Sequence, residues 1–274
     1  MDATGTGRVN ARPGALDGQV DAAGDRIHYV VQGAGDPVLL IHGAFGSGIN
    51  FLQTDFGQRL AERRRVIAPD SLGHGESDAP ADPGRYGARR RADHLAAVLD
   101  ALAIERAHVV GYSMGGWMAS ALATFHPGRI ASLAIGGWDV EAGMYTPAAA
   151  WGLPEITYDT LLAMVRETRP ERLVGLKPER EAGLAAAINA MNDLAGLADG
   201  VVRCAAPTAL WQGRDDLYHD ASRRFAREHG LSFIGLPGDH GSVLEAHGAE
   251  AARRVGEFIE QAARPGPGSA NQQG

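Results

Sequence analysis

Two residue types that often carry covalent or metal chemistry are nearly absent from this sequence. Cysteine occurs once in the 274 residues, at Cys204. A single cysteine excludes an intrachain disulfide framework and a cysteine-rich zinc site. Lysine also occurs once, at Lys177, in a Leu-Lys-Pro segment typical of a turn. Any P-loop or Schiff-base lysine would have to be that residue, and its surroundings fit neither role.

The sequence also lacks an excess of basic charge and any long apolar run. It has 26 Lys and Arg residues against 33 Asp and Glu, a formal net charge of −7, which argues against nucleic acid or an anionic membrane as a partner. No segment approaches the roughly 20 apolar residues of a membrane span. Residues 1–24 lack a signal-peptide pattern and are interpreted as a loose leader, and residues 265–274 as a disordered tail. A soluble, cytoplasmic protein is the default expectation.

Short apolar runs alternate with helical patterns along the rest of the chain. Strands are predicted at residues 27–31, 37–41, 65–69, 107–112, 130–136, 207–212 and 231–236, and helices at 88–102, 114–125, 221–228 and 248–263. This alternation predicts βαβ units and a mostly parallel sheet flanked by helices. Between 139 and 203 only helical patterns occur, at 158–167 and 179–194. We therefore expect an α/β core of residues 25–138 and 204–264 with a helical cap, residues 139–203, inserted into it.

The strongest chemical signal is the segment Gly111-Tyr112-Ser113-Met114-Gly115. It follows a predicted strand and opens a predicted helix, which is the setting of a G-x-S-x-G nucleophile elbow. The turn is so sharp that small residues must flank the serine, and its hydroxyl is exposed above the sheet. Ser113 is therefore the predicted nucleophile.

A serine nucleophile needs a base and an orienting acid. Of the 10 histidines, His240 alone follows a predicted strand in a loop, just before the last helix, so its imidazole can reach the serine. The acid is expected after the strand at 207–212, where Asp215 and Asp216 stand side by side. Spacing alone does not choose between them.

An acyl-transfer site also needs backbone donors for the oxyanion. One is predicted to be the N–H of Met114, directly after the nucleophile. The other is expected in the loop after the strand at 37–41, from Ala44 or Phe45, because Gly43 lets the backbone approach closely. His42 is expected to brace this loop rather than to transfer protons.

These residues together resemble the α/β-hydrolase superfamily over nearly the whole chain. The motifs occur in the family's order: His42-Gly43, then Asp70-Ser71-Leu72-Gly73-His74-Gly75-Glu76-Ser77, then the elbow, then Gly213-Arg214-Asp215-Asp216, and finally His240 with Glu245 beyond it. The resemblance implies the α/β-hydrolase fold with a helical cap after the sixth strand. It points to Asp216 as the acid, with Asp139 as an alternative because some branches place the acid after that strand. Here Asp239 precedes the histidine where the family commonly has glycine.

The resemblance implies a serine hydrolase that cleaves a carboxylic ester or related acyl bond through a Ser-His-Asp triad and an acyl-enzyme, with no cofactor and no metal. Alternatives within the fold are a carbon–carbon bond hydrolase acting on vinylogous diketones and a cofactor-free haloperoxidase-like enzyme. A non-catalytic ligand-binding member of the fold is the alternative from another class. A small molecule is the expected partner, and the oligomeric state stays open. The candidates to line an apolar substrate pocket are Trp117, Trp138, Met144, Tyr145 and Trp151.

Overall fold

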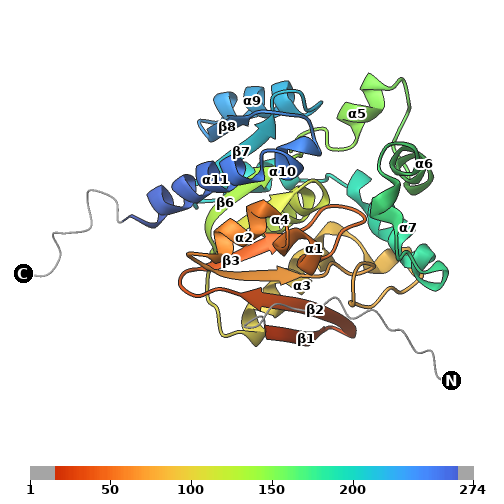
Figure 1. Ribbon diagram of the computed structural model, residues 1–274, viewed down its shortest axis with the longest axis horizontal. Coiled ribbons are helices and arrows are strands. Elements are labelled where there is room, and N and C mark those ends of the chain that lie inside the picture. Colours follow the sequence, from red (N-terminus) through yellow and green to blue (C-terminus); the bar gives the residue numbers. More distant parts are fainter. Residues whose placement is uncertain (1–15, 265–274) are drawn as a thin grey trace, which may run out of the picture.

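The computed structural model describes residues 16–264, and one sheet of eight strands runs through them (Figure 1). The strands are β1 (Leu16–Ala22), β2 (Asp25–Gln32), β3 (Pro37–Ile41), β4 (Arg65–Pro69), β5 (Ala107–Tyr112), β6 (Ile130–Gly136), β7 (Thr208–Gly213) and β8 (Ser232–Leu236). Their order in the sheet is β1-β2-β4-β3-β5-β6-β7-β8. The pairs β1–β2 and β2–β4 are antiparallel and every other pair is parallel. The mostly parallel sheet expected from the sequence is confirmed.

Helices cover both faces of this sheet. They are α1 (Gly48–Leu52), α2 (Asp55–Ala61), α3 (Ala88–Ala101), α4 (Met114–Phe125), α5 (Tyr145–Ala150), α6 (Tyr158–Thr168), α7 (Glu181–Asn189), α8 (Leu197–Arg203), α9 (His219–Glu228), α10 (Ser242–Glu245) and α11 (Gly248–Ala263). Short 3-10 helices join them: η1 (Pro83–Arg85), η2 (Pro127–Arg129), η3 (Pro170–Leu173), η4 (Pro178–Arg180) and η5 (Ala190–Asn192). Within residues 16–264, none of the helices combines the length and the apolar character that crossing a membrane requires.

The central strands are apolar on both faces because helices pack against each of them. In β3, Val38 and Leu40 belong to the core that α1, α2, α10 and α11 cover. Leu39 and Ile41 point the other way, into the core that α3, α4, α8 and α9 cover. This alternation follows from the two-residue period of a strand. The sheet therefore separates two cores. Because helices cover both of its faces, the loops at the strand ends are the places where a site can form.

The chain between β6 and β7 is helical, and no strand interrupts it in the described part of the molecule. Helices α5, α6 and α7 lie at one end of the sheet, at the right of Figure 1. Two contacts bind this region to α4. The indole Nε1 of Trp117 donates to the carbonyl oxygen of Asp193 at 2.9 Å. Helix α8 packs so closely that a Cβ on Gly200 would lie 2.0 Å from Oγ1 of Thr124. The last part of the expected cap thus lies against the core.

The expected leader at residues 1–24 is wrong for its last part. Strand β1 pairs with β2 along its whole length, from Leu16 opposite Val31 to Ala22 opposite Asp25. The two residues between the strands, Ala23 and Gly24, both have positive φ, 56° and 81°, as a tight hairpin turn requires. Strand β1 lies at the edge of the sheet, where backbone hydrogen bonds hold it and most of its side chains are polar or exposed. The sequence therefore shows no apolar run that would predict a strand there. Residues 1–15 and the expected tail at 265–274 lie outside the described residues.

Candidate active site

Ser113 lies in the turn that joins β5 to α4. Its φ of 58° and ψ of −120° fall in a region that L-residues rarely occupy and that is associated with functional sites. A Cβ on Gly111 would lie 2.1 Å from the carbonyl oxygen of Gly115, and a Cβ on Gly115 would lie 2.0 Å from that of Ile41. Only glycine fits at these two positions. The Gly-x-Ser-x-Gly pattern is therefore a steric requirement of this turn.

His240 and Asp216 meet although 24 residues separate them. Asp216 follows β7, His240 follows β8, and the imidazole Nδ1 lies 2.9 Å from Oδ2 of the aspartate. The Asp216 side chain is 1% exposed, and its Oδ1 accepts the backbone N–H of Tyr218 at 3.1 Å. Since Nδ1 donates to the carboxylate, Nε2 is the nitrogen left to accept a proton. His240 and Ser113 line the same cavity.

The two other candidate acids lie in different settings. Asp215 is exposed. Asp139 is buried, but its carboxylate is occupied in the turn that follows β6. Its Oδ1 accepts the backbone N–H groups of Glu141 and Ala142 at 3.0 and 3.2 Å, and its Oδ2 accepts the hydroxyl of Thr146 at 2.5 Å. Of the three aspartates, Asp216 is the one that contacts the histidine.

His42 holds the loop that follows β3. Its Nε2 accepts the backbone N–H of Ser71 at 3.0 Å, so its Nδ1 carries the proton and donates to the carbonyl oxygen of Gly43 at 2.8 Å. Burial lowers the pKa of His42 below its usual range, which keeps the ring neutral and able to accept. His42 thus braces the loop, as the sequence predicts, through both ring nitrogens.

The predicted oxyanion donors lie on either side of Ser113. Ala44 and Phe45 line the cavity, in a turn closed by the hydrogen bond from Gly46 N–H to the carbonyl oxygen of Gly43 at 3.2 Å. A Cβ on Gly43 would lie 3.3 Å from the Cβ of Ser113, so this loop passes close to the serine. Met114 is the first residue of α4, where backbone N–H groups have no partner within the helix and attract negative charge.

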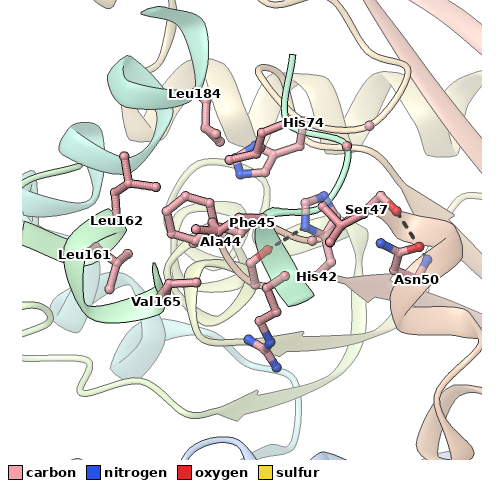
Figure 2. Close-up of a pocket in the computed structure, with 18 of the residues that line it drawn as sticks. His42, Ala44, Phe45, Ser47, Asn50, His74, Leu161, Leu162, Val165 and Leu184 are labelled. Atoms are coloured by element: carbon pink, nitrogen blue, oxygen red, sulfur yellow. Dashed lines mark hydrogen bonds between the residues drawn. The ribbon is translucent and has the colours of Figure 1, made fainter. Parts of the chain in front are cut away.

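A cavity of about 790 Å³ opens in front of Ser113. Its apolar wall is built by α6 and α7, as Figure 2 shows for Leu161, Leu162, Val165 and Leu184, which surround Phe45. Ser47 and Asn50 form a polar wall on the opposite side. Charged residues complete the lining, namely Glu76, Arg166, Glu171, Arg172, Lys177, Arg180, Glu181 and Glu245. The cavity is of the size and mixed character of small-molecule sites.

The side chains expected to line an apolar pocket lie elsewhere in the described structure: Trp117, Trp138, Met144, Tyr145 and Trp151. Trp117 and Trp138 are buried in the core below the cavity, and the thioether of Met144 accepts the hydroxyl of Tyr218. Tyr145 and Trp151 are 45% and 43% exposed on and after α5. Apolar character predicts burial or contact without giving the direction in which a side chain points, so the sequence could not place these five side chains relative to this cavity.

Sequence reasoning also missed two tyrosines that enclose His240. The Tyr112 and Tyr218 rings lie 5.2 and 5.7 Å from the imidazole, centroid to centroid. The Tyr112 hydroxyl donates to the backbone carbonyl oxygen of His240 at 2.7 Å. Tyr112 is adjacent to the serine in sequence, but nothing in the sequence indicates that its side chain reaches a residue 128 positions away. Tyr218 carried no signal beyond lying two positions after the acid.

Comparison with known proteins identifies relatives over part of the chain. A family model described as alpha/beta hydrolase fold matches residues 36–174, just over half of the sequence. The 2-hydroxymuconate semialdehyde hydrolase of Pseudomonas putida is 44% identical over 140 residues, which are 49% of this chain and 48% of the relative. The chain thus matches about half the length of such curated relatives.

Solved structures resemble nearly the whole chain. A meta-cleavage product hydrolase from Pseudomonas fluorescens has a TM-score of 0.67 at 25% identity, covering 89% of this chain and 98% of that one. A thermophilic esterase from Thermogutta terrifontis has a TM-score of 0.72 at 24% identity, covering 91% of this chain and 100% of that one. These similarities extend the shared fold to the strands and helices outside residues 36–174.

Proposed function

Because the chain belongs to the α/β-hydrolase fold family, we propose that it is a serine hydrolase that cleaves a carboxylic ester or related acyl bond of a small, mostly apolar substrate. One observation carries the proposal. His240, whose Nδ1 is bonded to Asp216, lines a single cavity with Ser113, and a serine hydroxyl is activated by a histidine that a carboxylate orients in this way. The apolar wall from α6 and α7 supports an apolar substrate.

In the proposed reaction Ser113 Oγ attacks the substrate carbonyl carbon while Nε2 of His240 takes the hydroxyl proton. Asp216 orients the imidazole and stabilises the imidazolium. The negative oxygen is held by the N–H of Met114 and by that of Ala44 or Phe45. His240 then gives its proton to the leaving alcohol, which leaves an acyl-enzyme. Water, deprotonated by His240, attacks the acyl-enzyme and releases the acid and the free serine.

A second candidate is a carbon–carbon bond hydrolase, and the relatives favour it. The Pseudomonas putida protein at 44% identity is named for 2-hydroxymuconate semialdehyde, and a further relative at 37% identity for 2-hydroxy-6-oxo-2,4-heptadienoate. The same serine and oxyanion donors would serve attack on a ketone carbonyl, with a stabilised carbanion as the leaving group. A panel of small esters assayed beside a vinylogous diketone separates the two, because each substrate class gives its own product and absorbance change.

The serine itself is tested by Ser113→Ala. We expect kcat to fall by about 10⁴- to 10⁶-fold, as when other serine hydrolases lose the nucleophile, and labelling by a fluorophosphonate to disappear. Ser120→Ala is the matched control, since Ser120 is buried on the same helix and its hydroxyl donates to the carbonyl oxygen of Gly116 at 2.9 Å. Its turnover should stay within about twofold of the wild type.

Two results would contradict the proposal. Wild-type protein that is neither labelled nor active on any ester or diketone would indicate a non-catalytic, ligand-binding role. Full turnover in the Ser113→Ala variant would move the chemistry to another residue.

A further inference from the structure

The residue directly before the serine contacts the backbone of the histidine. Tyr112 is the last residue of β5, and its buried hydroxyl donates to the His240 carbonyl oxygen at 2.7 Å. Burial raises the pKa of Tyr112 well above its ordinary value, so the phenol keeps its proton and remains a donor. The elbow strand and the loop after β8 are thereby joined by one side chain.

This tyrosine is part of a column of rings, in which its own contacts are tilted and those below it are stacked. Its ring lies 4.9 Å from the ring of Trp211, and Trp211 lies 5.3 Å from Phe56 at an interplanar angle of 12°. Phe56 is fully buried at the start of α2 and stacks in turn on Phe51. His240 is the last ring of the column, 5.2 Å from Tyr112. Although Tyr112 also lines the cavity, its ring is held in place by these core contacts.

The sequence makes room for these rings at two glycines, Gly136 at the end of β6 and Gly137 directly after it. A Cβ on Gly137 would lie 2.6 Å from Cζ of Tyr112, and a Cβ on Gly136 would lie 2.1 Å from Cε2 of Trp211. Gly137 also has a φ of 58°. A side chain at either position would displace the rings, so the column depends on glycine at both positions.

His240 needs such support because it stands on a half-buried loop. Its side chain is 40% exposed. The carboxylate of Asp239 accepts the N–H groups of Gly241 and Ser242 at 3.0 and 2.8 Å, which shapes the loop but does not attach it to the core. Asp216 orients the imidazole through Nδ1. The bond from Tyr112 is the one that ties the His240 backbone to the strand carrying Ser113.

We infer that Tyr112 is a positioning residue that sets the distance between the His240 imidazole and the Ser113 hydroxyl through its hydrogen bond to the His240 carbonyl. The inference rests on the proposed serine-hydrolase function. A general base must lie within hydrogen-bond reach of its proton, and small displacements of reacting groups strongly reduce rate. Losing this bond should therefore slow the chemical step and leave substrate binding nearly intact.

The test is Tyr112→Phe, which keeps the ring in the column and removes the donor. We expect kcat on an ester, and the rate of fluorophosphonate labelling, to fall about tenfold while KM stays within about twofold. Tyr86→Phe is the matched control. Its hydroxyl also donates to a backbone carbonyl, that of Pro80, at the same 2.7 Å, but outside the cavity lining. Its thermal stability should drop comparably and its kcat should not.

Each outcome separates the inference from the proposed function. An unlabelled, inactive wild-type protein contradicts the function. A labelled wild type together with a Tyr112→Phe variant of unchanged kcat overturns the inference, and so does an equal loss of kcat in Tyr86→Phe. Gly137→Ala gives an independent check if the first variant folds poorly, because its Cβ pushes the same ring from outside the cavity. The inference expects it to lower kcat with KM unchanged, and an unaltered kcat in a folded Gly137→Ala chain would overturn it.

Discussion

At the scale of single residues, neighbouring aspartates with the same chemistry differ in what their oxygens contact. Asp216 is buried against His240 and Tyr218, whereas Asp215 is exposed. We expect Asp216→Asn to lower kcat by about 10⁴-fold, because an amide that donates to Nδ1 holds the imidazole in the wrong tautomer. Steady-state hydrolysis of an ester measures this. The kcat of Asp215→Asn should stay within about twofold of the wild type. An equal loss of kcat in that variant would contradict the assignment of Asp216 as the acid.

Sequence patterns found the residues that spacing constrains and missed those that only packing brings together. Ser113 directly follows one predicted strand and His240 lies in the loop after another, so the topology of a parallel sheet brings them to one edge. Asp216 needed the family resemblance to be chosen over Asp215. Tyr112 was read as part of the motif, but the position of its ring depends on two glycines at the end of β6 and directly after it. No local pattern encodes such a contact.

At the scale of elements, buried strands were predicted well and edge elements poorly. The expected bounds of β3, β4, β5 and β6 agree with the structure, since each is a largely apolar run between turn residues. Strand β1 was missed because its pairing with β2 is formed by the backbone. Helices α1 and α2 were missed as well, since elements of 5 and 7 residues are too short to show a helical period.

A histidine on β2 makes the first strands sensitive to pH. His28 contacts Asp70 through Nδ1 at 2.8 Å and Asp17 of β1 through Nε2 at 2.7 Å. The hydrogen bond with Asp70 is the main cause that raises the pKa of His28 from 6.5 to about 9, although burial opposes it. Because the folded pKa lies above the unfolded one, the stabilisation is complete below pH 6.5 and disappears as the pH rises through 9.

The measurement is the free energy of unfolding in urea at pH 6.5 and 9.5 for the wild type and for His28→Gln. We expect the wild type to lose about 2–3 kcal/mol more than the variant over this interval. The comparison between the two proteins removes the contribution of every other titrating group. Identical pH dependence in both would show that folding does not raise the pKa of His28.

At the scale of the whole molecule, the cavity belongs to neither the sheet nor the helical region alone. The sheet side supplies Ser113, His240 and the loop at Ala44 and Phe45, and the helices after β6 supply the opposite wall. The sequence indicated both parts and their order. It did not indicate which helix of the insertion faces the serine, because α6 and the segment around α5 have similar apolar content and only docking on the core distinguishes them.

Since α6 forms the apolar wall, it should set the length of acyl chain that the cavity accepts. Leu162 of α6 is buried and points into the cavity beside Phe45 (Figure 2). We expect Leu162→Trp to fill this space and exclude the end of a long chain. Each methylene denied burial costs about 0.8 kcal/mol, so four of them should lower kcat/KM about two hundredfold for an octanoyl ester.

The matched control for that variant is Ala163→Trp, which adds the same indole one position along α6 at an exposed site. The measurement is kcat/KM of each variant on the acetyl and octanoyl esters of the same alcohol, so that the two variants are compared with the same leaving group. Both variants should hydrolyse the acetyl ester at near wild-type kcat/KM, because a two-carbon acyl group is too short to reach the space that the indole fills. If Leu162→Trp left the octanoyl ester unaffected, the acyl chain would have to lie along another wall, and the polar side at Ser47 and Asn50 would face it at an energetic cost. An equal loss on both esters would show that the indole disturbs the whole site, and it would also contradict the prediction.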